Sequence, residues 1–93
     1  LVKPNMIEIL SLSNQFRIVE IRTPDKWQGK SLLELNLRTT ERISIILIKR
    51  GDTVLAPPTP ECVLLPDDIL VIAGALADIK RLSNKGTAKV LED

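Results

Sequence analysis

Hydrophobic residues alternate with polar ones over short stretches of this chain, a pattern that is typical of strands. Residues 15–22 follow it and end at a proline-containing turn. Residues 43–48 are apolar on both faces apart from Ser44, and the turn residues 49–52 join them to residues 53–55. The sequence therefore predicts one strand followed, later in the chain, by a hairpin.

Three other segments show different periodicities. Residues 4–10 begin with a proline and carry apolar side chains at helical spacing, which predicts a short helix. Ser31 and Glu34 have the spacing of a capping box, which predicts a helix of one to two turns. Residues 69–73 form a short apolar run that predicts a buried strand, and residues 75–82 predict a final amphipathic helix.

These elements predict one small domain of strands and short helices. A chain of 93 residues has room for a single domain, and 44% hydrophobic with 27% charged residues is an ordinary globular composition. The predicted strands present more apolar surface than two small helices cover, so we expect a homodimer. Residues 85–93 are predicted to form a flexible tail.

Charge and composition argue against several kinds of function. A net charge of +1 and only two aromatic residues, Phe16 and Trp27, argue against a nucleic-acid partner. The chain has no histidine to activate its single Cys62, so we predict neither an enzyme nor a histidine metal site, and no cofactor. Asp67 and Asp68 could be read as paired catalytic carboxylates. They are adjacent at the entrance of a predicted strand, however, and turn composition accounts for both of them without any chemistry.

Polar and cationic residues gather beside apolar ones in the middle of the chain. Arg38 and Arg42 fall between a predicted helix and a predicted strand, where two guanidinium groups can grip a phosphate. The alternative is that they are solvated loop charges, and their spacing leaves both interpretations open. The whole group contains Leu33, Asn36, Arg38, Arg42, Ile43, Ser44, Lys49 and Arg50.

The order of these motifs resembles the TrkA C-terminal domain, also called the RCK C-terminal domain. The resemblance covers residues 16–82 and rests on several short motifs in a fixed order. The motifs are Ile18-Val19-Glu20-Ile21 followed by a proline, residues 29–35 with Leu37 and Arg38, residues 45–51, Pro58, and residues 68–74.

The resemblance implies an α+β domain whose mostly antiparallel, half-barrel sheet, in the order β-α-β-β-β-α, pairs with a second copy. Residues 1–14 then correspond to a linking helix and residues 15–84 to the regulatory domain. Such domains usually follow a nucleotide-binding domain in cytoplasmic subunits that gate potassium uptake, which fits a chain that begins at Leu1. The implied partner is a membrane ion channel or transporter subunit, contacted directly or through that missing domain at the inner face of the membrane.

In some members of this family the dimer binds cyclic di-AMP between the two copies. By position, Leu33, Ile43 and Pro58 are implied to pack on adenine, Asn36 and Arg38 to approach ribose and phosphate, and Ser44 to lie at the base edge. Ser44 departs from the family, because the cyclic di-AMP binders carry asparagine there. The sequence therefore predicts a ligand-sensing dimer, with a ligand-free dimerisation module of a transporter or transcription regulator as the alternative.

Overall fold

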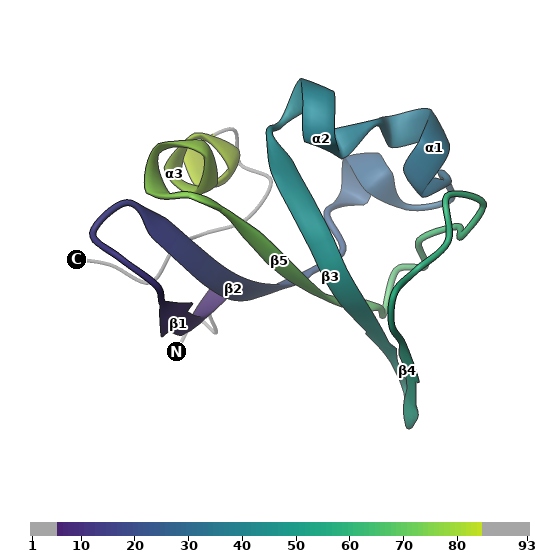
Figure 1. Ribbon diagram of the computed structural model, residues 1–93. Coiled ribbons are helices and arrows are strands. Elements are labelled where there is room, and N and C mark those ends of the chain that lie inside the picture. Colours follow the sequence, from purple (N-terminus) through teal and green to yellow (C-terminus); the bar gives the residue numbers. More distant parts are fainter. Residues whose placement is uncertain (1–5, 85–93) are drawn as a thin grey trace.

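One antiparallel sheet organises the domain, whose computed structural model describes residues 6–84 (Figure 1). Its strands lie in the order β1-β2-β5-β3-β4, and each neighbouring pair is antiparallel. The α+β class and the antiparallel sheet are confirmed, and the sheet is open, with β1 and β4 at its edges. The strands are β1 (Met6–Ser11), β2 (Phe16–Arg22), β3 (Ile43–Arg50), β4 (Thr53–Leu55) and β5 (Ile69–Ala75).

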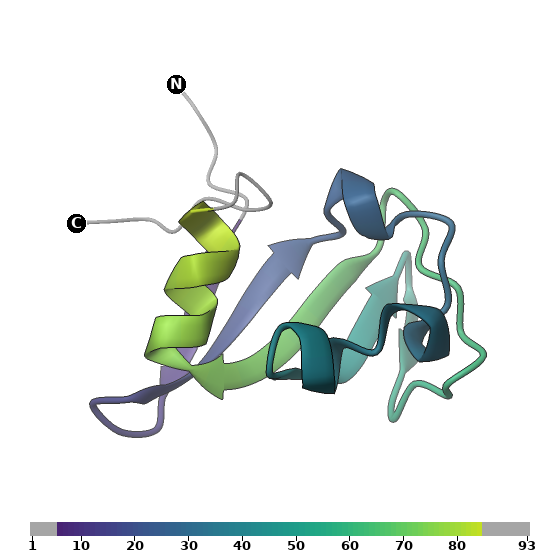
Figure 2. The same ribbon diagram turned by 90° about the horizontal axis from the view of Figure 1, so that it is seen from above.

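The helices lie together on one side of this sheet, as Figures 1 and 2 show. They are α1 (Leu32–Leu35), α2 (Leu37–Thr40) and α3 (Leu76–Asn84), and a 3-10 turn, η1 (Asp25–Trp27), precedes them. Ile79 and Leu82 of α3 and Leu37 of α2 are buried against the sheet. Because α1 and α2 are single turns, their packing and caps hold them in place rather than their intrinsic helicity.

Strand register gives the sheet two distinct faces. Val19, Ile72 and Ile45 lie side by side across β2, β5 and β3, and the next inward row is equally apolar. These rows form the floor of the core under the helices. On the opposite face Ala73 lies beside Ser44, and no helix among the described residues covers that face (Figure 1).

The N-terminal segment differs from the prediction, because residues 6–11 form strand β1 and not a linking helix. Met6 pairs with Ile21 of β2, and its side chain is buried in the core. A segment this short is a weak isolated helix, whereas pairing with β2 gives its backbone groups partners along a strand. The helix predicted for residues 4–10 is therefore wrong over the described part, and residues 1–5 and the predicted tail lie outside it.

The remaining predicted elements are confirmed with small shifts in their bounds. The hairpin of β3 and β4 turns at Gly51, whose φ of +60° suits glycine. Strand β5 continues through Gly74 to Ala75, beyond the predicted residues 69–73. An added Cβ at Gly74 would stand 3.0 Å from Cγ2 of Ile43, so glycine relieves a tight contact where β5 passes β3.

Candidate functional site

A pocket of about 400 Å³ opens between the two short helices, strand β3 and the segment that follows β4. Ile43 and Ile45 form its floor, where adjacent inward positions of β3 place them on the helix-covered face. Most of the lining is apolar. The lining residues are Leu32, Leu33, Asn36, Leu37, Arg38, Ile43, Ile45, Pro58 and Pro60.

The helical wall of the pocket is set by local sequence signals. The Ser31 hydroxyl accepts a hydrogen bond from the Glu34 amide at 3.1 Å, and the Glu34 carboxylate accepts one from the Ser31 amide at 3.2 Å. The predicted capping box is therefore present. It fixes the start of α1, so that Leu32 and Leu33 face the pocket.

Asn36 separates α1 from α2 and stands at the edge of the pocket. Its φ and ψ of 49° and 49° are left-handed, a conformation that asparagine tolerates better than most residues. The turn stops α1 after four residues and redirects the chain into α2. The Asn36 side chain makes no capping hydrogen bond, so its amide is available at the pocket with both a donor and an acceptor.

Arg38 brings a positive charge to the same edge. It lies on α2, is exposed, and within residues 6–84 its guanidinium makes no ion pair. Leu33 lies on the rim as well, with 70% of its surface exposed. An unpaired guanidinium beside an exposed leucine suits a ligand that carries an anionic group next to a flat apolar one.

Five of the predicted site residues, Leu33, Asn36, Arg38, Ile43 and Pro58, line this one pocket. Ser44 does not line it. Successive side chains of a strand point to opposite faces, so Ser44 lies on the face away from the helices, beside Ala73. The expectation that Ser44 stands with the other five is therefore not met within this chain.

Two of the cations grouped with the site have other partners. Lys49 of β3 pairs with Glu20 of β2, across β5, and Arg50 pairs with Asp68 at 2.7 Å. Neither lines the pocket, and exposed Arg42 does not line it either. Arg38 is thus the cation that the structure brings to the pocket.

Sequence reasoning missed four of the lining residues: Leu32, Leu37, Ile45 and Pro60. Ile45 and Pro60 each follow a predicted site residue by two positions, and strand alternation alone could have added Ile45. Leu37 begins α2, a helix that the sequence analysis did not predict.

The acidic residues near the turn before β5 differ in their environments. Asp67 is exposed, as expected for a turn, whereas only 2% of the Asp68 side chain is exposed. Hydrogen bonds from Arg50 lower the pKa of the Asp68 carboxyl group, against the opposing effect of burial, and the Leu65 amide lowers it further. Asp68 is therefore held as a carboxylate by its partners.

The described residues contain no group of three or more histidine, cysteine, aspartate or glutamate side chains that could hold a metal ion. Cys62 is partly buried and has no disulfide partner. No helix in the described part of the chain is long and apolar enough to cross a membrane.

An apolar pocket with one amide and one guanidinium at its edge, on an α+β domain with an open antiparallel sheet, is the arrangement typical of a small ligand-binding module. Residues 16–85 match the sequence model of the TrkA-C domain. The chain belongs to the TrkA-C domain family, and the resemblance seen in its sequence motifs is confirmed.

Two curated relatives come from Bacillus subtilis (strain 168). Ktr system potassium uptake protein C is 34% identical over 85 residues, which cover 91% of this chain and 38% of that protein. Ktr system potassium uptake protein A is 35% identical over 82 residues, covering 88% of this chain and 37% of that protein. The chain therefore spans less than two fifths of the length of these relatives.

Solved structures share the fold. The RCK C domain of the potassium transport protein KtrA, in complex with cyclic diadenosine monophosphate, is 35% identical with a TM-score of 0.68, covering 73% of this chain and 80% of that chain. The GsuK channel is 26% identical with a TM-score of 0.75, covering 86% of this chain and 15% of that chain. The RCK_C domain dimer of S. agalactiae BusR in complex with c-di-AMP is 25% identical with a TM-score of 0.62, covering 70% of this chain and 88% of that chain.

Proposed function

We propose that this domain is a cytoplasmic regulatory module of a potassium uptake or other cation transport system, and that it binds cyclic di-AMP between two copies. Its family and its relatives among the Ktr potassium uptake proteins support the transport role. The structures of two similar domains are of their complexes with this dinucleotide, which supports the choice of ligand. Its partner is a channel or transporter subunit, contacted directly or through a nucleotide-binding domain.

The pocket is the observation that carries the proposal. An adenine base fits an apolar floor and wall, and Ile43, Pro58 and Leu33 supply these surfaces. Asn36 can donate to and accept from ribose or base atoms, and Arg38 can grip a phosphate with two parallel hydrogen bonds. One chain thus offers contacts for one half of a symmetrical dinucleotide.

Two-fold symmetry explains why a second copy belongs to the site. Cyclic di-AMP has two adenines and two phosphates, so each Arg38 of a symmetrical pair meets one phosphate. The rim position of Leu33, which is 70% exposed, suits a surface that a ligand and a second copy cover. A ligand held across two copies binds one relative arrangement of them better than others and thereby biases the attached transporter.

Calorimetry on the purified domain tests the proposal. We expect cyclic di-AMP to bind with micromolar or tighter affinity at one ligand per two chains, while cyclic di-GMP and ATP do not. Arg38→Ala should abolish this binding without unfolding the domain, because it removes the unpaired cation at the pocket. Arg17→Ala is the matched control, since Arg17 lies on β2 and pairs with Glu8 at 3.5 Å, away from the pocket.

Three results of this experiment would contradict the assignment of Arg38 or the proposal itself. Unweakened binding by Arg38→Ala places the site elsewhere, and equal losses in the Arg38 and Arg17 variants indicate a general charge effect. No binding of any of the three nucleotides by the wild-type domain contradicts the sensor proposal.

A ligand-free interaction module is the second candidate, and the helix-free face of the sheet favours it. Ile7, Leu10 and Phe16 are each about half exposed on strands β1 and β2. Exposed apolar side chains of this size often mark contacts between proteins. This candidate predicts a dimer whose melting temperature no nucleotide shifts, so a thermal-shift screen with the same three nucleotides distinguishes it from the sensor.

A further inference from the structure

One wall of the pocket is an irregular segment that contains turns but no strand or helix. We call residues 56–68, which join β4 to β5, the strap. The strap supplies Pro58 and Pro60 to the pocket that Ile43 and Ile45 of β3 also line. Because a segment of this kind makes no continuous ladder, its position depends on a few specific hydrogen bonds.

Main-chain hydrogen bonds join the strap to the start of α1. This contact includes a single β-bridge between Ser31 and Val63. The strap and α1 therefore form one unit that carries two walls of the pocket. The bonds run from Leu33 N to Pro60 O at 2.8 Å, from Leu32 N to Cys62 O at 3.0 Å, from Leu64 N to Lys30 O at 3.0 Å and from Gly29 N to Leu64 O at 2.8 Å.

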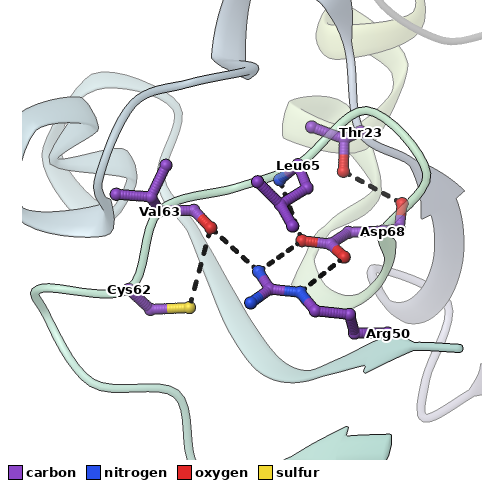
Figure 3. A network of polar contacts seen from close by, with 6 residues as sticks. All are labelled: Thr23, Arg50, Cys62, Val63, Leu65 and Asp68. Atoms are coloured by element: carbon purple, nitrogen blue, oxygen red, sulfur yellow. Dashed lines mark hydrogen bonds and ion pairs between the residues drawn. The ribbon is translucent and has the colours of Figure 1, made fainter. Parts of the chain in front are cut away.

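Arg50 attaches this unit to the sheet at the far end of β3, as Figure 3 shows. Its Nε donates to Oδ1 of Asp68 at 2.9 Å, and its Nη2 donates to Oδ2 at 2.7 Å. The same Nη2 donates to the carbonyl oxygen of Val63 at 2.9 Å. One planar guanidinium thus bridges the middle and the end of the strap, which a lysine ammonium cannot reproduce with the same geometry.

Asp68 carries the other half of this attachment. Its Oδ2 accepts a hydrogen bond from the Leu65 amide at 2.9 Å, which closes the strap's last turn. Its main-chain oxygen accepts from the Thr23 amide at 3.1 Å and from the Thr23 hydroxyl at 2.9 Å. The end of the strap is therefore tied to the chain that leaves β2 as well as to β3.

We infer that Arg50 is a positioning residue for the ligand pocket: through Asp68 and Val63 it holds the strap so that the proline wall stays opposite the β3 floor. This inference rests on the proposed ligand-binding function. Arg50 does not line the pocket, and a strand rise of about 3.3 Å per residue sets it roughly 16 Å along β3 from Ile45. Its effect on binding is therefore exerted through the strap.

The test compares cyclic di-AMP binding by wild type and Arg50→Gln in calorimetry. We expect Arg50→Gln to weaken binding about tenfold, because a loosened wall must be ordered when the ligand binds. Arg50→Lys keeps the charge next to Asp68 without the forked geometry, so it should recover part of the affinity. Arg17→Gln on β2 is the matched arginine control and should bind as wild type does.

Two further measurements separate positioning from a general loss of stability. Val19→Ala shortens a buried side chain on β2, two strands from β3, so it should lower the melting temperature without changing affinity at a temperature where the domain is folded. Hydrogen exchange should be about tenfold faster in Arg50→Gln at the amides of Leu33 and Leu64, and unchanged at Ile72 in β5.

If the wild-type domain binds cyclic di-AMP and the affinity of Arg50→Gln lies within twofold of it, the inference about Arg50 is wrong while the proposed function stands. An equal loss of affinity in Val19→Ala contradicts the inference in the same way. Unchanged exchange at Leu33 and Leu64 in Arg50→Gln also overturns it. Absence of binding by the wild-type domain overturns the proposed function and this inference with it. If Arg50→Gln does not fold, Arg50→Lys takes its place, with an expected loss between twofold and tenfold.

Discussion

The Asp68 carboxylate is almost completely buried and yet charged, so its removal should be costly. It accepts hydrogen bonds from Arg50 Nε, Arg50 Nη2 and the Leu65 amide, at 2.9, 2.7 and 2.9 Å. In Asp68→Asn one oxygen remains as an acceptor, while the new NH₂ group faces donors from Arg50 or Leu65. The substitution therefore removes the negative charge and leaves at least one donor without a partner.

The structure sets the size of this effect. Removing one partner of a fully buried ion pair costs about 3–5 kcal/mol, but 35% of the Arg50 side chain is exposed and water can take up part of the lost contact. We therefore expect Asp68→Asn to lower the free energy of unfolding by about 2–3 kcal/mol. For a domain of this size that corresponds to a drop in melting temperature of roughly 10–20 °C.

Thermal unfolding followed by circular dichroism measures the drop, with fluorescence of the single Trp27 as a second probe. Asp67→Asn is the matched control, because Asp67 is the exposed neighbour in the same turn. It should stay within about 0.5 kcal/mol of wild type, as surface substitutions usually do. If Asp68→Asn unfolds at the same temperature as Asp67→Asn, the ion pair with Arg50 does not stabilise the domain and the reasoning is wrong.

Two other predictions follow from the same contacts. The pKa of Asp68 is lowered in the fold, chiefly by Arg50, so its stabilising effect should be complete above about pH 5 and fade as the pH falls below about 4. Denaturant unfolding of wild type and Asp68→Asn across this range should show their difference shrinking in acid; a constant difference would contradict the assignment. Gly74→Ala should destabilise the domain by about 1–3 kcal/mol, since the new Cβ meets Ile43 Cγ2 at 3.0 Å, and an unchanged melting temperature would show that Ile43 moves aside freely.

Local sequence signals predicted most of the elements correctly because each acts over a few residues. The capping box of Ser31 and Glu34 is present, and the hairpin turns at Gly51. The helix prediction for residues 6–11 was wrong because the sequence does not reveal that the edge of β2 is free to pair with this segment. Helix α2 was missed since a left-handed residue, Asn36, starts it without a capping hydrogen bond.

Long-range partners were beyond such signals. Arg50 and Asp68 each stand in a segment with turn composition, and either is explained locally by the turn chemistry of its neighbours. Their pairing depends on the antiparallel register of β3 with β5, which brings the start of β5 beside the end of β3. Once that register is known, a buried carboxylate next to the hairpin requires a cation, and Arg50 is in reach.

The candidate site shows the same division between local and long-range information. Asn36 and Arg38 are placed by helix ends that the chain builds locally, whereas Pro58 lies on the strap, whose main chain is hydrogen-bonded to distant residues of α1 and β3. Ser44 illustrates the converse, since strand alternation already separates it from Ile43, and the bulge in the β3–β5 register lies later, between Ile45 and Leu47. A residue carried over by position from a family therefore has to agree with strand alternation before it is assigned to a site. By that criterion, we predict that a polar contact from this pocket to the base comes from Asn36 and not from Ser44.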